Sequence, residues 1–183
     1  MSPPRRERGA ILVVALMFLV LLTIIGVSSM SGTTLEEKMA GNQREQNIAF
    51  QAAESALRDA EIDLETATGG LGNRDPMTIA ANFATLCSAA FTNGVCKAAV
   101  HTTQIVTPAG WSWTDANKTV AYGTYTGADT LGGVFRQPRY VIEYLSDKDV
   151  APNTRHFRIS ARGWGANQNS SVTLQTVYKM PMN

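Results

Sequence analysis

The most one-sided stretch of the chain is an apolar run near its start. From Ala10 to Leu35 no residue is charged, and residues 10–27 are almost entirely aliphatic. A helix over residues 10–27 would rise about 27 Å, close to the hydrocarbon thickness of a bilayer. The pattern predicts a helix that lies in a membrane or in an equally apolar environment.

A short basic segment, residues 1–9, precedes the apolar run. It holds Arg5, Arg6 and Arg8 against a single carboxylate, Glu7. Membrane orientation follows the Lys/Arg bias beside an apolar segment, so this end is expected on the cytoplasmic side. The rest of the chain is then expected outside the cytoplasm.

The helical pattern continues beyond the apolar run as an amphipathic segment that extends to about Glu65, with no proline between Ala10 and Asp75. Apolar residues at spacings of three and four predict one face that packs on a sheet. The residues of this face are Ala49, Phe50, Ala53, Ala56, Leu57, Ala60 and Leu64. Charged residues are expected on the other faces, namely Glu54, Arg58, Asp59, Glu61, Asp63 and Glu65. Joined to the apolar run, this segment predicts one helical spine of roughly 56 residues.

The spine is predicted to be locally weak at residues 26–34. Gly26 and the small residues after it are weak helix formers. Capping-box patterns begin at Thr33 and Thr34, so a helix could also start there. The end of the spine is predicted at residues 66–70, where two glycines can adopt the left-handed conformation on which helices commonly end.

The last third of the chain alternates between apolar and polar residues, which predicts strands. Three segments carry the pattern: residues 140–145, 155–162 and 171–178. Turn residues separate them, so an antiparallel meander is the simplest connection. The apolar face of the spine is available to cover this sheet, which gives an α+β fold.

The middle of the chain gives a weaker signal. A short helix is predicted over residues 77–86, after Pro76. Residues 92–138 are dense in glycine and proline, which predicts loops with short strands over residues 99–106 and 119–125.

The chain has two cysteines, Cys87 and Cys96. Outside the cytoplasm such a close pair predicts a disulfide. Closing so short a loop would stabilise the fold by about 2.7 kcal/mol in the chain-entropy model. Zinc is the weaker alternative, because His101 and His156 do not have finger-like spacing.

Charge and candidate chemistry argue against several functions. The chain has 16 basic and 15 acidic residues, with no basic surplus for nucleic acid. Neither histidine has an acidic or nucleophilic partner at a recognisable spacing, so neither an enzyme nor a cofactor is expected. Asp129, Asp147 and Asp149 could ligate calcium, but such residues are typical of turns.

The first third of the chain resembles a type IV prepilin, and more narrowly a minor pilin of the PilX family. Prepilins carry a short basic leader that ends in glycine, and they keep the apolar half-helix after cleavage. Arg8-Gly9 before Ala10 is similar to that junction. Residues 35–42 and 49–61, LEEKMAGN and AFQAAESALRDAE, look like the PilX signature.

This resemblance implies the type IV pilin fold, a long N-terminal helical spine packed on an antiparallel β-sheet headgroup. It also implies that a prepilin peptidase cleaves between Gly9 and Ala10 and that the new amine of Ala10 is methylated. The implied segments are a leader (residues 1–9), a transmembrane or filament-core half-helix (10–32), an amphipathic half-helix (33–68) and a periplasmic headgroup (69–183).

Two positions depart from the general pilin pattern. Most pilins begin the mature chain with phenylalanine and have glutamate at the fifth mature position; here these are Ala10 and Val14. In pilin families that buried glutamate is held to pair with the N-terminal amine of a neighbouring subunit. A subunit without it suits the filament tip, and the tip pseudopilin of type II secretion is similar in lacking it. The alternative is that a minor pilin tolerates the loss.

The resemblance implies a minor pilin that primes type IV pilus assembly and enters the filament at or near its tip, with a role in adhesion or twitching motility. Implied partners are prepilin peptidase, other minor pilins, the major pilin, a PilY-family tip adhesin and inner-membrane lipid. The implied location is the bacterial inner membrane, with the headgroup in the periplasm, and then the extracellular pilus. Two other classes stay open: a type II secretion minor pseudopilin, and an exported binding protein with an ordinary signal sequence cut near Gly26.

Overall fold

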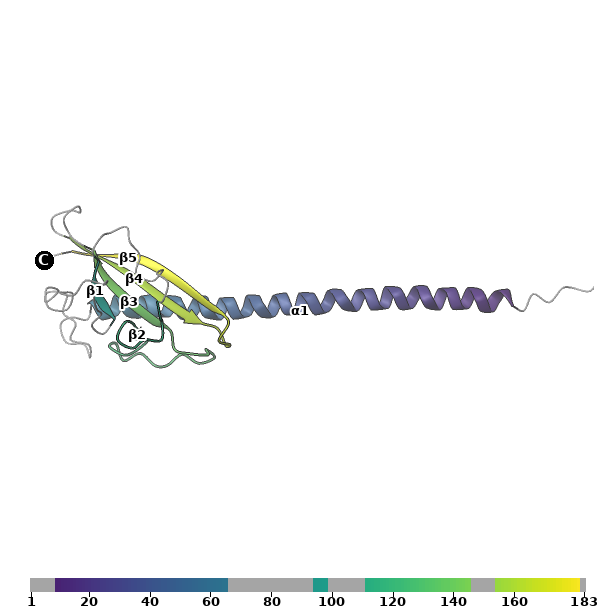
Figure 1. Cartoon of the computed structure of the whole chain (residues 1–183), viewed down its shortest axis with the longest axis horizontal. Helices are drawn as coiled ribbons and strands as arrows, with labels where there is room; N and C mark the ends of the chain where they lie inside the picture. Colours follow the sequence, from purple (N-terminus) through teal and green to yellow (C-terminus); the bar gives the residue numbers. More distant parts are fainter. Residues whose placement is uncertain (1–8, 66–93, 99–110, 146–153, 182–183) are drawn as a thin grey trace, which may run out of the picture. The chain divides into compact units, whose positions relative to one another are not determined.

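The computed structural model describes residues 9–65, 94–98, 111–145 and 154–181. Within these residues one helix and five strands follow one another (Figure 1): α1 (Ala10–Glu65), β1 (Val95–Lys97), β2 (Val120–Ala121), β3 (Arg139–Leu145), β4 (Thr154–Trp164) and β5 (Ser171–Pro181). Two compact units, Met1–Gln43 and Arg44–Asn183, make up the chain, and each is described by itself.

The first unit contains the apolar part of α1. Its stretch Ala10–Ser28 is, by length and composition, able to cross a membrane, and none of it is buried inside the protein. Ile11, Leu12 and Phe18 are 74%, 70% and 63% exposed. A continuous apolar surface of this kind needs lipid or other apolar helices around it. The backbone of α1 is helical throughout residues 26–34, where the sequence predicts a weakness.

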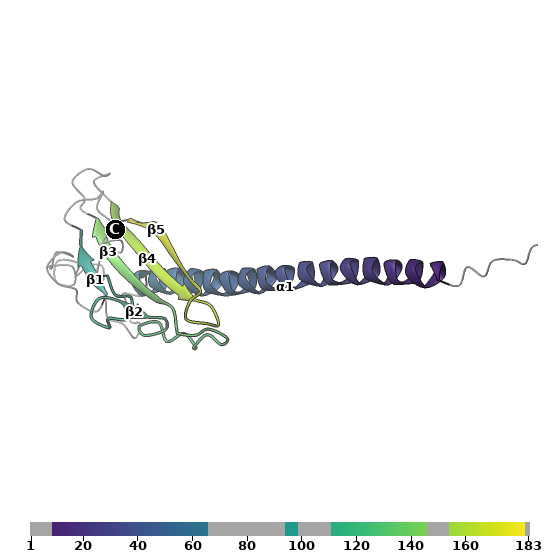
Figure 2. The same cartoon turned by 45° about the vertical axis from the view of Figure 1, so that its right-hand side comes forward.

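The second unit contains a five-stranded sheet. Four of its strands follow the order β1-β3-β4-β5, and the short strand β2 also pairs with β3. Figure 2 shows these strands side by side. Strands β3, β4 and β5 form the predicted antiparallel meander, with Tyr140 opposite Ala161 and Ile159 opposite Thr176. β1 pairs in parallel with β3, which the sequence does not predict, because three residues are too few to show an alternation.

The predicted strand over residues 119–125 is much shorter in the structure. Only Val120 and Ala121 pair with β3, and a turn occupies residues 122–126. Gly123, with a φ of 76°, begins the departure from extended backbone. The predicted helix over residues 77–86, the strand over 99–106 and the glycines at 69 and 70 lie outside the described residues.

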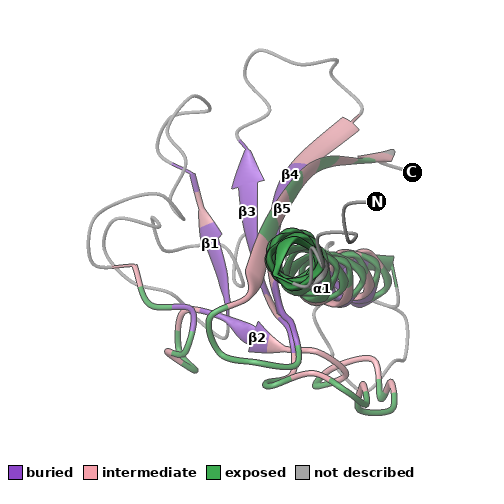
Figure 3. Cartoon of the chain, turned by 90° about the vertical axis from the view of Figure 1, so that its right-hand side faces the viewer, coloured by how far each residue is buried: buried purple, intermediate pink, exposed green. Residues whose placement is uncertain are grey.

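The core of the second unit lies between the C-terminal part of α1 and one face of the sheet. Ala56, Ala60 and Leu64 pack there against large side chains of β3 and β4, which are Tyr140, Ile142, Tyr144, Phe157 and Ile159. Figure 3 shows β3 drawn as a buried strand. A helix that packs on one face of a mainly antiparallel sheet gives the chain an α+β fold.

Small residues allow α1 to approach β4 very closely. A Cβ atom added to Gly163 would stand 2.2 Å from the Ala49 carbonyl oxygen and 2.3 Å from the Ala53 backbone nitrogen. Ala49 and Ala53 are both fully buried at this contact. The backbone of the helix therefore rests almost directly on the backbone of the strand.

This close contact shifts the buried face of α1 from the predicted one. Phe50 is 45% exposed, whereas Asp59 and Asp63 are 2% and 5% exposed. At about 100° per residue, Phe50 lies a quarter turn from Ala49. The two aspartates lie on the opposite side of the alanine stripe, where the sheet and its turns cover them. The prediction was therefore wrong for Phe50 and for both aspartates.

Candidate functional site

The residues of the predicted processing site lie at the start of α1. Gly9 is the residue before the helix, and its carbonyl oxygen accepts a hydrogen bond from the Val13 backbone nitrogen at 3.4 Å. A Cβ added at Gly9 meets no atom within 4 Å. Packing in the subunit therefore does not require a glycine there. Val14 is 52% exposed and continues the apolar surface of the helix.

The predicted packing residues of α1 occupy three environments. Ala53 and Ala60 are fully buried and Leu64 is 3% exposed. Leu57 is half-buried and packs against the edge of the core. Phe50 is 45% exposed.

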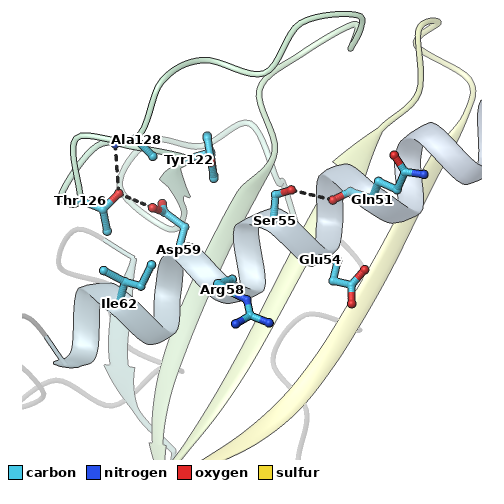
Figure 4. A pocket seen from close by; sticks show the side chains of 9 residues that line it. All are labelled: Gln51, Glu54, Ser55, Arg58, Asp59, Ile62, Tyr122, Thr126 and Ala128. Carbon is cyan, nitrogen blue, oxygen red and sulfur yellow. Dashed lines mark hydrogen bonds between the residues drawn. The ribbon is translucent and has the colours of Figure 1, made fainter.

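Asp59 fastens a turn of the headgroup to the helix. One carboxylate oxygen accepts a hydrogen bond from the Gly123 backbone nitrogen at 2.8 Å, and the other accepts one from the Thr126 hydroxyl. Figure 4 shows Asp59 pointing from α1 toward Thr126. A Cβ at Gly123 would stand 2.3 Å from the Ala128 carbonyl oxygen, so the turn is too tight for a side chain there.

An open groove of about 610 Å³ lies between α1 and this turn. Its lining residues, drawn in Figure 4, are Gln51, Glu54, Ser55, Arg58, Asp59, Ile62, Tyr122, Thr126 and Ala128. The Ser55 hydroxyl donates to the Gln51 carbonyl oxygen at 2.8 Å. The Asp59 carboxylate is already bonded to the turn, so it is not available as a base for the Ser55 hydroxyl. The lining residues therefore provide a mixed polar and apolar contact surface.

Two further hydrogen bonds tie the end of α1 to the sheet. The Tyr140 hydroxyl donates to the Asp63 carboxylate at 2.8 Å, and both side chains are buried. The Tyr178 hydroxyl donates to the Glu65 carboxylate. That hydrogen bond, together with burial and the nearby negative charges, raises the pKa of Tyr178 to about 12.

The sheet face opposite α1 carries a buried ion pair. Glu143 on β3 is fully buried, and Arg158 stands opposite it on β4 with its guanidinium 3.6 Å from the carboxylate. Burial raises the pKa of Glu143 to about 7, although the positive charge of Arg158 acts in the opposite direction. The free energy lost when the Glu143 carboxylate leaves water is larger than the free energy gained from its attraction to Arg158.

Aromatic residues form a second, smaller core on that face. Trp113, Val141 and Trp164 are buried together, with Trp111 packed at the margin. The rings of Trp111 and Trp113 meet edge to face, with centroids 5.9 Å apart. Lys118 lies over Trp111, and Arg136 and Arg162 lie over Trp164.

Cys96 lies in β1 and is fully buried and disulfide-bonded. Its predicted partner, Cys87, lies outside the described residues, so this pairing stays a prediction. Among the residues that the structure describes, no three His, Cys, Asp or Glu side chains are grouped so that they could hold a metal ion. His101, Asp147 and Asp149 lie outside that part, and Asp129 is exposed on a loop.

The comparisons with known families match both ends of the chain. A family model described as PilX N-terminal matches residues 8–58, and a model described as type IV pilus assembly protein PilX C-term matches residues 83–180. No curated protein and no solved structure gives a significant match. The first matched stretch contains the apolar helix and the α1 contact residues as far as Leu57, and the second contains the described sheet up to Met180.

Proposed function

The chain belongs to the PilX family of type IV pilus assembly proteins, and on that basis we propose that it primes pilus assembly and is incorporated at or near the filament tip. The family consists of structural pilins, not enzymes, and its members act together with other pilus components. The observation that carries the proposal is the exposed apolar helix of Ala10–Ser28, which is continuous with the helix on which the headgroup is built.

The proposal begins with processing at the start of α1. Prepilin peptidase cleaves after Gly9, and the new amine of Ala10 is methylated. The open surroundings of Gly9 support this, because packing in the subunit gives no reason for a glycine there. A glycine lets a protease approach the backbone closely.

The apolar helix then serves in two environments. Before assembly it anchors the subunit in the inner membrane, with the basic leader on the cytoplasmic side and the headgroup in the periplasm. During assembly it exchanges lipid contacts for the apolar helices of other minor pilins and the major pilin. Such exchange is driven by close packing, because lipid is as apolar as the helix itself.

Val14 supports a position at the filament tip. A glutamate at this point of an apolar helix would need a partner, since an unpaired buried carboxylate costs several kcal/mol. Val14 makes no such demand and offers no such pairing to a subunit above. At the tip, the headgroup is free to bind a partner outside the filament. The expected partner is a PilY-family adhesin, so this binding would affect adhesion and twitching motility.

Pili from the native host test the proposal. Deletion of the gene should reduce surface pili recovered by shearing, and the wild-type chain should restore them. An epitope-tagged chain should label filament ends in immunogold micrographs. Val14→Glu should spread the label along the fibres, whereas Val14→Leu should not. Normal piliation without the gene would contradict the priming role, and wild-type label along whole fibres would contradict the tip position.

A further inference from the structure

Two arginines and a tryptophan form a distinct surface on the sheet face opposite α1. Gly163 faces the helix, so the next residue of β4, Trp164, points to the other side of the sheet. The guanidinium carbons of Arg136 and Arg162 lie 5.9 and 5.7 Å from the centroid of its ring. Trp164 is 7% exposed, because it packs with Trp113 and Val141 and the two cations lie over its ring.

The positive charge of this surface is not balanced by nearby acids. A third arginine, Arg139, stands directly opposite Arg162 across β3 and β4. Burial first, and then the charge of Arg136, lower the pKa of Arg139, while Asp115 opposes them. Asp115 itself pairs with Lys118 at 3.9 Å. In the part of the chain that the structure describes, Arg136, Arg139 and Arg162 form no ion pair.

The three arginines differ in how many donors they have left. Arg139 uses two of its nitrogens on the hydroxyl and carbonyl oxygens of Thr119, at 2.6 and 2.7 Å. Arg162 uses one nitrogen on the Ser171 hydroxyl at 2.7 Å. Arg136 is exposed and donates no hydrogen bond to any described residue. Arg136 therefore presents its guanidinium to solvent. In Arg162 the Nε atom is buried, so at most the terminal nitrogen that Ser171 does not use is left for a ligand.

The loop that carries Arg136 is held in place before any ligand arrives. The Phe135 backbone nitrogen donates to the Gly165 carbonyl oxygen at 2.6 Å. The Gln137 side chain closes the loop through both backbone groups of Leu131, at 2.9 and 2.8 Å. Arg136 is thus positioned beside Trp164 by bonds on both sides, which reduces the entropy that a ligand would have to overcome.

We propose that Arg136 and Arg162, supported by Trp164, form a docking surface for an acidic segment of a partner protein. A guanidinium fork matches the two oxygens of a carboxylate. Phe135, 48% exposed and next in sequence to Arg136, offers a peptide an apolar contact that a free phosphate cannot use. Single-stranded nucleic acid fits poorly, because it needs exposed aromatic faces and the rings of Trp113 and Trp164 are buried. The surface belongs to the headgroup, so the proposal does not depend on the position of the subunit in a pilus.

The test is peptide binding to the full chain in detergent micelles, measured by fluorescence anisotropy. The probe is a labelled peptide of alternating glutamate and leucine, and its comparison is the same peptide with glutamine for glutamate. Arg136→Gln should weaken binding about tenfold, the value of one charge-assisted hydrogen bond. Arg136→Lys should weaken it less, because it keeps the charge and loses the fork. The matched control is Arg44→Gln, another exposed arginine, which should leave binding unchanged.

Arg162→Gln should also weaken binding, and circular dichroism must show that it keeps the wild-type fold, because Arg162 also binds Ser171. Arg136→Gln is the decisive variant, since the Arg136 side chain donates no hydrogen bond to any residue that the structure describes. Equal binding of the glutamate and glutamine peptides would overturn the proposal. So would equal loss in Arg136→Gln and Arg44→Gln, tighter binding of a single-stranded oligonucleotide, or no binding of the glutamate peptide to the wild-type chain.

Discussion

Replacing Gly163 with alanine should strongly destabilise the headgroup. Its Cβ would enter the backbone of α1, and neither the Ala49 carbonyl nor the Ala53 nitrogen can move away as a flexible side chain could. We expect Gly163→Ala to lower the free energy of unfolding by at least about 2 kcal/mol. Thermal unfolding of the full chain in detergent, followed by circular dichroism of the sheet, measures this.

The matched control is Gly132→Ala, where an added Cβ meets nothing within 4 Å and no positive φ is involved. It should leave the unfolding temperature of the headgroup almost unchanged. Equal stability of Gly163→Ala and Gly132→Ala would contradict the close helix-to-strand contact.

Asp59 should be the most important polar residue on α1. Asp59→Ala removes the acceptor for the Gly123 nitrogen and the Thr126 hydroxyl and leaves the turn without its anchor. We expect a loss of roughly 2–3 kcal/mol, since hydrogen bonds to a charged group are the stronger kind. Chemical denaturation measures it, and Asp129→Ala, on an exposed loop, is the control. Equal effects of the two substitutions would show that the turn does not depend on Asp59.

Glu143 should make stability depend on pH in the direction opposite to that of most carboxylates. Its pKa is about 7 in the folded chain and ordinarily 4.5, so the folded state holds the proton more tightly. The contribution of Glu143 to unfolding free energy should therefore fall as pH rises from about 4.5 to about 7, by at most roughly 3 kcal/mol. Above about pH 7 Glu143 is ionised in both the folded and the unfolded chain, and the full free-energy cost of burying its charge lowers stability.

The variant Glu143→Gln isolates this effect, because its side chain does not titrate. Stability of wild type and variant should be compared at several pH values across that range. The wild type should lose stability relative to the variant as pH rises. Parallel curves would show that Glu143 keeps an ordinary pKa in the folded chain.

Individual side chains are where sequence reasoning is weakest. Spacing alone places Asp59 and Asp63 with the charged faces of the helix, because a carboxylate is normally exposed. Their burial depends on Gly123, Thr126 and Tyr140, which are 60 or more residues away in sequence. The sequence gives one local signal of this burial. Asp59 and Asp63 are four residues apart, as Ala56 and Ala60 are, so the two aspartates form a row on the helix next to the buried alanines.

Among the elements, the three-residue strand β1 at the sheet edge should depend on the disulfide for its stability. Cys96 pairs with the backbone of β3 opposite Glu143. We expect Cys87→Ser to lower the unfolding free energy by about 2–3 kcal/mol. A reducing agent should destabilise the wild type to a similar extent and have no further effect on the variant. A wild type insensitive to reductant would contradict the predicted pair.

Elements with a long local pattern are those that the sequence predicts well. β3, β4 and β5 have seven to eleven residues each, enough for their alternation to show. β1 and β2 have three and two residues, and their pairing with β3 depends on contacts distant in sequence. β4 also differs from the expected two-faced strand, because Arg158 and Ser160 on its polar face are buried as well as Phe157 and Ile159.

At the scale of the whole molecule, the two units suit two solvents. The surface of Ala10–Ser28 is apolar all round, whereas the second unit buries its own core. The contact between helix and sheet is made by small residues and a glycine, so α1 can hold the headgroup tightly while its N-terminal part stays available to lipid or to other pilins. Membership of the PilX family and this division of labour together support an assembly subunit.

The most direct test of the proposed function is the N-terminal residue of the mature protein, measured by mass spectrometry on membranes and sheared pili of the native host. We expect a chain that starts at Ala10 and carries one added methyl group. A Gly9→Val variant should remain unprocessed and absent from pili. A mature chain that starts near Ser29, or one that keeps Met1, would contradict assembly through the Ala10–Ser28 helix.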